Sequence, residues 1–501
     1  MSDETPRLDL GIFEQGDPQW DHTDTVEAVD EYAIERGSLD ERPDRGEHDD
    51  ELFHVIEQGI TWRWDEKADD WVHFSGTGSE TQQVPGTSSF ETAQFDHAHS
   101  KKTPVWNVEA HGIEGDGEHE VGQAVHELLG TVAEAGGGIV YFPPGRYRFE
   151  RTPLIGDSTI IEGAGHSTVF EGVRPDGPTG RALLSNRGFD SPGYEGASNW
   201  AVRNLRIDSP ESNGIMPAHA ENVRFENIHG DRIYYHHLDI VSSRHVTIDG
   251  FRATQGGRDD DADAPVQFDN QIPGTDANGI WDGDASTYAT ADGTPVQNCT
   301  LTDFEIAPEN GPEYGVRIHR EGAESITITE GRITGCQHSA IRADTGEEVT
   351  DLTVDGVSCL ENARGISLGE IESGRHGLTI DNVTIRTEDS SLAGGSGLYA
   401  SGFDEAEISN ILVEGQFENS ILFDDMADLK LSTVTARGAS SQALRFRTNA
   451  DATLTTARAA DCGDAGLYVG PDSSLAYGGV SFENVGEEVT VDGELREWRR
   501  S

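Results

Sequence analysis

Positive charge is scarce in this sequence of 501 residues, and lysine is almost missing. Lysine and arginine together number 36 against 92 aspartates and glutamates, so the formal net charge is −56. The lysines are Lys67, Lys101, Lys102 and Lys430. So few cations cannot form a basic face, and the composition therefore excludes nucleic acid as a partner.

The same imbalance predicts a dependence on salt. Acidic residues are spread over the whole chain, and their mutual repulsion destabilises a compact fold unless salt screens it. At molar ionic strength the screening length is roughly 3 Å. Dispersed acid with little lysine resembles the proteins of halophilic archaea that accumulate salt, and a binder of cations or of basic partners is the alternative. We expect the fold to be lost on dilution from molar salt, which circular dichroism would detect.

Cysteine and long apolar runs are also scarce. Cys299, Cys336, Cys359 and Cys462 are far apart and include no C-x-x-C pair, so we expect buried free thiols rather than a disulfide framework. Hydrophobic residues make up 35% of the chain but never form an apolar run of about 18 residues, so membrane insertion is not expected. The N-terminal stretch contains no apolar segment and no twin arginine, so no export signal is expected.

Two interleaved ladders of apolar residues dominate the sequence from residue 200 onward. The first ladder consists of Val202, Phe225, Ile248, Leu301, Ile328, Val354, Ile380, Ile408, Leu431 and Leu454. The second consists of Ile215, Leu238, Val266, Val316, Ile341, Ile366, Leu398, Ile421, Leu444 and Leu467. Intervals of mostly 23 to 28 residues, with at least two strands per repeat, predict a parallel β-helix. A β-propeller would need a period of about 40 residues.

A corner and two strands are expected ahead of the ladders. In 136-GGGIVYFPPGRYRFE-150, Ile139 to Phe142 favour a strand, Pro143-Pro144-Gly145 force a turn, and alternation then resumes. The glycines at the start of this stretch end a helix that precedes it. We expect this helix to cap the solenoid.

These residues carry a resemblance to a known family. The segment 105-VWNVEAHGIEGDGEHEVGQAVHELLGTVAEAGGGIVYFPPGRYRF-149 and its continuation 154-LIGDSTIIEGAGHSTVF-170 resemble the N-terminal cap and first coils of pectate-lyase-superfamily β-helices. The resemblance covers roughly residues 105–480 and implies an all-β fold, a right-handed parallel β-helix with a helical N-terminal cap. It does not specify a reaction, because the family includes lyases, hydrolases, epimerases and viral tailspikes. The usual Asp-Asp-Thr after GDG is replaced here by 118-EHEVG-122.

The ends of the chain do not follow the repeat. Residues 1–100 are expected to form a small α+β region, with a helix over 23–37 and an aromatic hairpin over 59–74. The pattern from Arg42 to Trp71 resembles the attachment hairpins of virus tail-fibre proteins, and an ordinary accessory or oligomerising domain, for instance in a homotrimer, is the alternative. The solenoid is then expected over 101–485, followed by a C-terminal tail over 486–501.

One long insertion interrupts the solenoid. An interval of 53 residues in the first ladder and of 50 in the second place it at about 270–295. A long excursion from one coil is where solenoids build binding walls. The acidic run 258–263, or Asp276, Asp282 and Asp284, could hold calcium, and a solvated acidic loop is the alternative. No cofactor is otherwise expected.

A charged cluster is expected on the outward face beside this insertion. Side chains alternate along a strand, so the residues between and after the ladder positions point outward on neighbouring coils. The candidate catalytic residues are Asp239, Asp269, His319 and Asp344. The candidate substrate-binding residues are His237, Gln267, Arg317, Arg342 and Trp281. Ordinary outward polar residues of a solenoid are the alternative.

This cluster suits two reactions on a polysaccharide. The backbone positions of Asp239 and Asp269 are expected to be about 8 Å apart in space, one rung and two residues from each other. This fits the separation of roughly 6.5–9.5 Å between the acid and base of inverting glycosidases. A lyase would instead use Arg317 or His319 as the base, with Arg342 or calcium neutralising a uronate carboxylate. We therefore expect a protein that binds, and as hydrolase or lyase cleaves, an acidic or cell-surface polysaccharide.

A non-catalytic receptor-binding tailspike or structural protein of a haloarchaeal virus is the main alternative. The expected location is cytoplasmic or virion-associated, in a high-salt environment.

Overall fold

The structure is a computed structural model. It describes residues 103–497 except 176, 178, 255–263, 274–277, 283–285, 308–310, 320–321, 344–348, 370–374 and 389–394. Before residue 103 it describes only the backbone of six short strands. The chain divides into two compact units, Met1–Pro104 and Val105–Ser501.

The first unit contains a five-stranded sheet in the order β1-β2-β3-β4-β5. Its strands are β1 (Glu35–Gly37), β2 (Leu52–Val55), β3 (Ile60–Asp65), β4 (Asp70–Ser75) and β5 (Ser79–Thr81), and β6 (Ser88–Phe90) follows them in the chain. Strands β3 and β4 are antiparallel, with Trp64 opposite Trp71, where the sequence predicted an aromatic hairpin.

The helix expected over 23–37 lies outside the described residues except for its last three. These three residues form strand β1, which pairs with β2, so the helix prediction is wrong there. Pairing with a neighbouring strand overrides a weak helical pattern.

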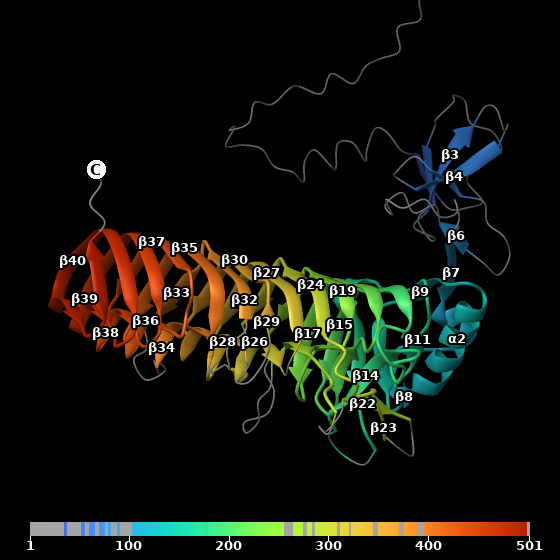
Figure 1. Ribbon diagram of the computed structural model, residues 1–501. Helices are drawn as coiled ribbons and strands as arrows, with labels where there is room; N and C mark the ends of the chain where they lie inside the picture. Colours follow the sequence, from blue (N-terminus) through green and yellow to red (C-terminus); the bar gives the residue numbers. More distant parts are fainter. Residues whose placement is uncertain are drawn as a thin grey trace, which may run out of the picture. The chain divides into compact units, whose positions relative to one another are not determined.

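A cap closes the first turn of the second unit. It consists of β7 (Thr103–Asn107), the 3₁₀ turn η2 (Val108–His111), β8 (Asp116–Glu120) and α2 (Gly122–Glu134). Helix α2 buries Val125, Leu129 and Val132 against the solenoid (Figure 1). After it, Gly137 has a φ of 99°, and a Cβ there would lie 2.3 Å from the carbonyl oxygen of Ser158, so only glycine fits. No helix in the described part is long and apolar enough to cross a membrane.

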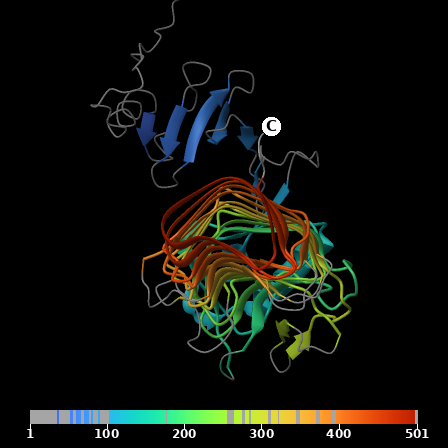
Figure 2. The same cartoon turned by 60° about the vertical axis from the view of Figure 1, so that its left-hand side comes forward.

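The rest of the unit is a right-handed parallel β-helix of about 13 turns, as the ladders predicted. Each turn supplies one strand to each of three parallel sheets, which we number 1, 2 and 3 in chain order, and the turns stack behind one another (Figure 2). Sheet 3 contains β11 (Leu154–Ile155), β14 (Arg181–Asn186), β16 (Asn213–Met216), β18 (Leu238–Val241), β21 (Val266–Asp269), β26 (Tyr314–His319), β28 (Ser339–Ala343), β31 (Arg364–Leu368), β34 (Ser396–Ser401), β36 (Asn419–Asp424) and β38 (Gln442–Phe446).

Sheets 1 and 2 are formed in two ways. In some turns each sheet has its own strand, in the pairs β9 (Gly138–Phe142) and β10 (Gly145–Phe149), β12 (Thr159–Gly163) and β13 (Thr168–Gly172), β19 (Arg244–Asp249) and β20 (Arg252–Ala253), β24 (Val296–Thr302) and β25 (Phe304–Ile306), β32 (Arg375–Asp381) and β33 (Thr384–Thr387). In others one strand bends from sheet 1 into sheet 2, namely β15 (Ser198–Ser209), β17 (Glu221–Ile233), β27 (Ala323–Thr334), β30 (Leu352–Leu360) after the short β29 (Val349–Thr350), β35 (Phe403–Gly415) and β37 (Leu429–Arg437).

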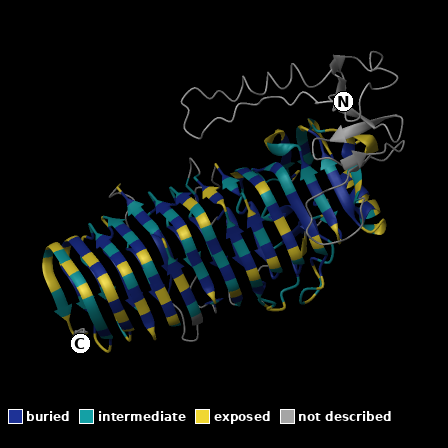
Figure 3. Ribbon diagram, turned by 90° about the horizontal axis from the view of Figure 1, so that it is seen from above, coloured by how far each residue is buried: buried dark blue, intermediate teal, exposed yellow. Residues whose placement is uncertain are grey.

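Both sequence ladders are confirmed in register. Val202 pairs with Phe225 and Phe225 with Ile248 in sheet 1, and Leu238 pairs with Val266 in sheet 3. The ladder residues are buried and form one continuous core, while the residues between them alternate outward, which gives the banded pattern of Figure 3. The four cysteines are free and buried in this solenoid, as expected.

The corner between sheets 1 and 2 depends on a left-handed residue in successive turns. Positive φ recurs at Asn204, Asn227, Gly250, Asp303, Glu330, Gly356, Asn382, Asn410 and Thr433. Asparagine, aspartate and glycine tolerate this conformation best. The side chains also stack, because the Nδ2 of Asn227 donates to the Oδ1 of Asn204 at 3.0 Å.

The C-terminal residues continue the solenoid instead of forming the tail that we expected over 486–501. Strands β39 (Asp451–Val469) and β40 (Ser474–Val491) each pass through all three sheets, and β41 (Glu494–Glu497) pairs with the start of β40. Both ladders continue into this turn, because Leu454 pairs with Tyr477 and Leu467 with Val489, and both partners pack against the core. The prediction of a tail was therefore wrong as far as residue 497.

Candidate functional site

The insertion folds back over the outward face of sheet 3. We call residues 270–295 the strap. Its described part contains the antiparallel strands β22 (Gly279–Trp281) and β23 (Ser286–Tyr288), and β22 pairs with β14 (Figure 1). The backbone N–H of Thr152 donates to the carbonyl of Trp281 at 2.8 Å. The strap therefore extends from β21 back to the first turns and does not stand beside the solenoid as a wall.

Apolar contacts hold the strap against sheet 3. Outward residues of β14, β16 and β18, which a bare solenoid would expose, form a second hydrophobic cluster with strap residues. This cluster consists of Ala182, Phe189, Met216, Ala218, Val241, Ile280 and Ala289, with Leu154 packed against it. Ile280 is 6% exposed and Ala289 is 4% exposed. The strap thus covers sheet 3 from β14 to β18.

Hydrogen bonds hold the part of the strap that follows β23, residues 290–294. The two ring nitrogens of the fully buried His219 lie 2.7 Å from the carbonyl oxygen of Gly193 and 2.8 Å from that of Thr290. The Asp292 carboxylate accepts the N–H groups of Gly193 and Thr294. Although burial raises the pKa of Asp292, these hydrogen bonds outweigh it and the pKa is lowered.

The two carboxylates that the sequence nominated for catalysis are buried, and the strap contacts one of them, Asp269. Asp239 and Asp269 are 0% exposed and Gln267 is 3% exposed. The Nε2 of Gln267 donates to Asp239 at 3.3 Å. Asp269 accepts the side-chain amides of Gln271 and Asn278 at 2.8 and 2.9 Å, so its carboxylate fixes the base of the strap. The expected register is correct, but the expectation that these groups are accessible to substrate is wrong.

His237 points into the solenoid and not onto the face. Its ring packs against Phe251 with centroids 6.0 Å apart, and a Cβ on Gly230 would lie 2.7 Å from it. Strict alternation fails here because the chain turns a corner just before each sheet 3 strand. His236 is the residue that faces outward, and the charges of Arg317 and His319 affect it. Burial lowers the pKa of His236 to about 3, although its hydrogen bond to the Ala264 carbonyl raises it, and the charges of Arg317 and His319 lower it further.

Trp281 and the calcium candidates do not join the cluster. Trp281 lies beyond β14, four rungs or roughly 19 Å from Asp269 at the usual strand spacing. Asp282 forms an ion pair with Arg151. Asp344, Asp276, Asp284 and 258–263 lie outside the described residues. Among the residues that are described, no group of three or more histidine, cysteine or acidic side chains could hold a metal ion.

Three of the nominated residues do come together on an accessible surface. Arg317 and Arg342 pair in register on β26 and β28, and His319 lies two residues after Arg317; all three are half-buried. Arg364 on β31 and Tyr399 on β34 lie on the following turns and are also half-buried. We call Arg317, His319, Arg342, Arg364 and Tyr399 the cationic face.

Small residues position the cationic face. The Nη1 of Arg342 donates to the buried hydroxyl of Ser367 at 2.8 Å. A Cβ on Gly369 would lie 2.7 Å from the ring of Tyr399 and 3.4 Å from the guanidinium of Arg342, so the missing side chain lets these two groups approach. Burial, followed by the charge of Arg342, lowers the pKa of Arg364. The two guanidinium groups are therefore close enough to interact.

Aromatic residues support the first arginine from the side. The guanidinium of Arg317 lies 5.3 Å from the ring centroid of Tyr314, within the range of a cation–π contact. Tyr314 in turn packs edge-on against His338, and its hydroxyl donates to Glu313 at 2.8 Å. The ring of Tyr314 thus lies against both Arg317 and His338.

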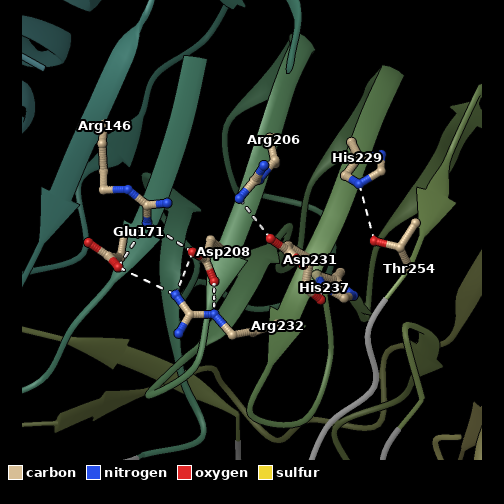
Figure 4. A network of polar contacts seen from close by, with 9 residues as sticks. All are labelled: Arg146, Glu171, Arg206, Asp208, His229, Asp231, Arg232, His237 and Thr254. Carbon is tan, nitrogen blue, oxygen red and sulfur yellow. Dashed lines mark hydrogen bonds and ion pairs between the residues drawn. The ribbon is translucent and has the colours of Figure 1, made fainter. Parts of the chain in front are cut away.

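A second polar network lies on the outward face of sheet 2 (Figure 4). Asp208, which is 1% exposed, accepts Arg146 at 2.9 Å and both Nε and Nη2 of Arg232 at 2.8 and 2.6 Å. Arg206 pairs with Asp231 at 2.7 Å. Burial raises the pKa of Asp208, but the two arginines outweigh it and the pKa is lowered. Because each of these carboxylates is paired with a guanidinium, the network joins the early turns and suits a structural role.

A shallow hollow of about 410 Å³ lies next to that network. It is lined by His166, Glu226, Asn227, Asp249, Gly250, Arg252 and Asp303. Arg252 is already paired with Asp303 at 2.9 Å. The hollow therefore mainly presents carboxylates, and we favour the cationic face as the candidate site because three of the nominated residues, Arg317, His319 and Arg342, lie on it.

Sequence reasoning missed four residues around the cationic face, and two signals could have found three of them. Tyr399 lies in a column that was considered but was not nominated. Tyr314 and Arg364 occupy a column two residues before the second ladder, and His236 lies two residues before Leu238, whereas His237 was the one candidate taken from before the ladder. The position of His237 is otherwise filled by Gly214, Pro265, Gly315, Ala340, Gly365 and Gly397. A column of small residues marks an inner corner.

Comparison with known proteins supports a pectate-lyase-like β-helix. Residues 105–253 match a family model described as rhamnogalacturonase A/epimerase, pectate lyase-like. The match ends before β21, so it includes β14, β16 and β18 but neither the strap nor the cationic face.

Individual relatives are distant. Plasmin and fibronectin-binding protein A of Streptococcus pneumoniae (strain ATCC BAA-255 / R6) is 25% identical over 169 residues, which span 29% of this chain and 23% of that protein, less than a quarter of its length. The crystal structure of PfbA, a surface adhesin of the same species, has a TM-score of 0.48 at 14% identity and covers 78% of this chain and 91% of that one.

Two further solved structures are similar at this level. The A-module of mannuronan C-5 epimerase AlgE6 of Azotobacter vinelandii has a TM-score of 0.40 at 13% identity, covering 78% of this chain and 98% of that one. Tailspike protein 3 of bacteriophage CBA120 has a TM-score of 0.45 at 10% identity, covering 94% and 79%.

Proposed function

We propose that this protein binds an anionic polysaccharide, and that the cationic face is its binding site. One observation carries the proposal. Arg317, Arg342 and Arg364 gather with His319 and Tyr399 on consecutive turns of a chain that has only 36 basic residues against 92 acidic ones. Such a concentration of guanidinium groups on an overwhelmingly acidic surface suits an anionic ligand.

The spacing of these groups favours an extended ligand with repeated acid groups. Neighbouring rungs are about 4.8 Å apart, so Arg317 and Arg342 can each bind a different carboxylate along one chain. Guanidinium groups bind carboxylates through two parallel hydrogen bonds. Tyr399 offers an aromatic surface for the apolar face of a sugar ring. A polyuronate combines these features.

Burial of Asp239 and Asp269 argues against inverting hydrolysis at the positions first considered. Both carboxylates are fully buried, and Asp269 accepts two side-chain amides of the strap. A substrate therefore cannot reach these two carboxylates in this structure, although the expected separation between them fits inverting hydrolysis.

Proton abstraction is the second candidate function. His319 is half-buried and lies on β26, the same strand as Arg317 and the neighbour of the strand that carries Arg342. In this position its imidazole could remove the proton next to a uronate carboxylate that one of the arginines neutralises. A lyase or epimerase would use this arrangement, whereas a receptor-binding spike would use only the binding.

Calorimetry with polyuronates tests the proposal. Polygalacturonate and alginate are titrated into the wild type and into Arg342→Gln, which we expect to weaken binding by about tenfold to a hundredfold. Arg458→Gln is the matched control, because Arg458 is exposed on sheet 2 and paired with Glu483. Equal binding by wild type and Arg342→Gln would exclude this face.

The same samples separate the candidate functions. Ultraviolet absorbance of an unsaturated uronate reports a lyase, and proton exchange at C5 in deuterated water reports an epimerase. Binding without either signal favours the non-catalytic protein.

A further inference from the structure

The last turn of the solenoid ends in a strand that is paired along one edge. Strand β40 pairs with β39 over its whole length, whereas β41 pairs only with its first residues, 474–477. Over residues 478–491 the other edge of β40 pairs with no strand in the part of the chain that the structure describes. The backbone groups along this edge are a template for a further strand.

The core beneath this turn is incompletely covered. Four apolar residues of β40 pack against the core and are yet only half-buried, namely Val480, Phe482, Val485 and Val489. The residues that pair with them one turn earlier are at most 5% exposed, namely Ala457, Ala459, Cys462 and Leu467. The C-terminal end thus combines an unpaired strand edge with partly exposed apolar side chains (Figure 3).

The same turn is strongly acidic. Residues 470–497 contain seven aspartates and glutamates and one arginine. Glu483, Glu487 and Glu488 lie along the unpaired stretch of β40 and are exposed. In a pair of β40 edges from two copies of this chain, these carboxylates would repel one another. The charge therefore disfavours a second copy as the partner of this edge.

An earlier turn of similar acidity shows which side chains such carboxylates bind. Residues 403–424 contain six acidic residues and no lysine or arginine. Glu407 pairs with Lys430 at 3.0 Å and Glu414 pairs with Arg437 at 2.5 Å, and both cations come from the following turn. Inside the solenoid, an acid-rich turn is therefore followed by a turn that supplies cations.

Glu483 occupies the column of Glu414 at the end of the solenoid. The register connects Glu414 with Arg437, then Ala460, then Glu483. Glu483 pairs with Arg458 of the preceding turn, but its side chain is 63% exposed, against 28% for that of Glu414. A following strand with a cation in this column would cover Glu483 as Arg437 covers Glu414.

We propose that the C-terminal end of the solenoid binds an extended segment of another protein, which adds to the edge of β40 as the next rung. In this segment apolar residues alternate with arginine or lysine. The apolar side chains pack over Val480, Val485 and Val489, and the cations meet Glu483 and its acidic neighbours. The acidic edge thus disfavours self-association and at the same time selects a basic partner.

A peptide with the sequence of this chain's own cation-bearing turn is the probe. Residues 433–447, TVTARGASSQALRFR, contain three arginines and no acidic residue. The labelled peptide is titrated with the full chain at the lowest salt concentration at which circular dichroism shows the folded protein. Fluorescence anisotropy should give one peptide per protein and a Kd of roughly 10 µM.

Two control peptides separate strand addition from attraction by charge. One has the same composition in scrambled order, and the other carries Arg437→Glu, Arg445→Glu and Arg447→Glu. Both should bind at least about tenfold more weakly, because the first loses the alternation and the second loses the cations.

Hydrogen exchange and matched variants locate the peptide. Its binding should slow exchange of the N–H groups within residues 478–491. Glu487→Gln with Glu488→Gln should weaken binding by about threefold to tenfold. Glu324→Gln with Glu330→Gln removes the same charge from β27, six turns away, and should change binding by less than about twofold. Circular dichroism verifies that both variants are folded.

The outcomes decide which segment covers this edge. Preferential binding of the alternating peptide, with protection of residues 478–491, supports the proposal. Equal binding of the scrambled peptide would overturn it, because charge alone would then explain the binding. Without peptide, protection that rises with protein concentration would overturn it in favour of a second copy. Complete protection in the dilute protein would overturn it by showing that the chain covers its own edge.

Discussion

The strands in the two halves of sheet 3 pair in the same register, but the outward residues of the two halves differ in type and in burial. From β14 to β18 the strap covers the face, and the apolar residues Met216, Ala218 and Val241 are buried there. From β26 to β34 the same columns carry Arg317, His319, Arg342 and Tyr399, which are half-buried. Apolar outward side chains lie under the strap together with the charged Asp269, which accepts two amides of the strap.

This difference shows which signals indicate a site on a solenoid. A charged residue at an outward position was not enough, because Asp239 and Asp269 are outward and yet inaccessible. The apolar outward residues Met216, Ala218 and Val241 were the better signal. On a bare solenoid they would be exposed, so their presence indicates that another segment covers that part of the sheet.

Removing the cover should have the largest effect. Ile280→Asp places a charge in the second hydrophobic cluster, and we expect it to destabilise the closed strap by about 3–4 kcal/mol. Hydrogen exchange at the N–H of Thr152, which bonds to Trp281, would accelerate by about a hundredfold or more.

The same hairpin offers a matched control for this change. Tyr288 is 48% exposed and contacts Arg181, so Tyr288→Asp should change stability by less than about 1 kcal/mol. Slow exchange at Thr152 in Ile280→Asp would show that the strap does not depend on this cluster. The two halves of sheet 3 would then differ for another reason.

The inner corner allows a test by double substitution. One turn earlier, the large Ile207 in sheet 2 faces the corner and the small Gly214 precedes the sheet 3 strand. In the next turn the sizes are exchanged, because Gly230 takes the position of Ile207 and His237 that of Gly214. Gly230→Ile alone overpacks the corner, and His237→Gly alone leaves a cavity, so each should destabilise by about 2–3 kcal/mol.

The combined variant should recover most of that loss. Gly230→Ile with His237→Gly restores the arrangement of the preceding turn, and thermal unfolding should give a favourable coupling of about 2 kcal/mol or more. Additive losses would mean that the two side chains do not share the same space.

The fold was predictable because its signal is local and repeated. Every ladder position was assigned from spacing alone, and pairs such as Ile248 with Leu301 are correct even across the insertion. The site was predictable only in part. Register located Arg317, Arg342 and His319, but the path of the strap depends on contacts between Ile280 and residues about a hundred positions earlier in the chain, and no periodicity encodes those contacts.

Acid should weaken the covered half through its buried histidines. Burial lowers the pKa of His237 to about 4, against about 6.5 in an unfolded chain. Between these values the unfolded state binds more protons, so stability is complete above pH 6.5 and falls as the pH is lowered toward 4. His237 alone should remove about 2 kcal/mol at pH 5. The Gly230→Ile, His237→Gly double variant should lose that much less between pH 6.5 and 5 in urea titrations, and parallel pH profiles would contradict this assignment.

The smallest expected change in stability tests the half that carries the cationic face. Gly369→Ala would place a methyl group 2.7 Å from the ring of Tyr399 and 3.4 Å from Arg342. Both side chains are half-buried and can move, so we expect a loss of at most about 1 kcal/mol. Binding should suffer more, because a displaced arginine no longer matches a carboxylate geometrically, and a several-fold loss of polyuronate affinity is expected. Gly479→Ala is the matched control, since its nearest neighbour is the Thr455 carbonyl at 3.8 Å and it lies far along the solenoid. If Gly369→Ala binds polyuronates as tightly as Gly479→Ala does, the approach of Tyr399 and Arg342 is not what makes this half a binding surface.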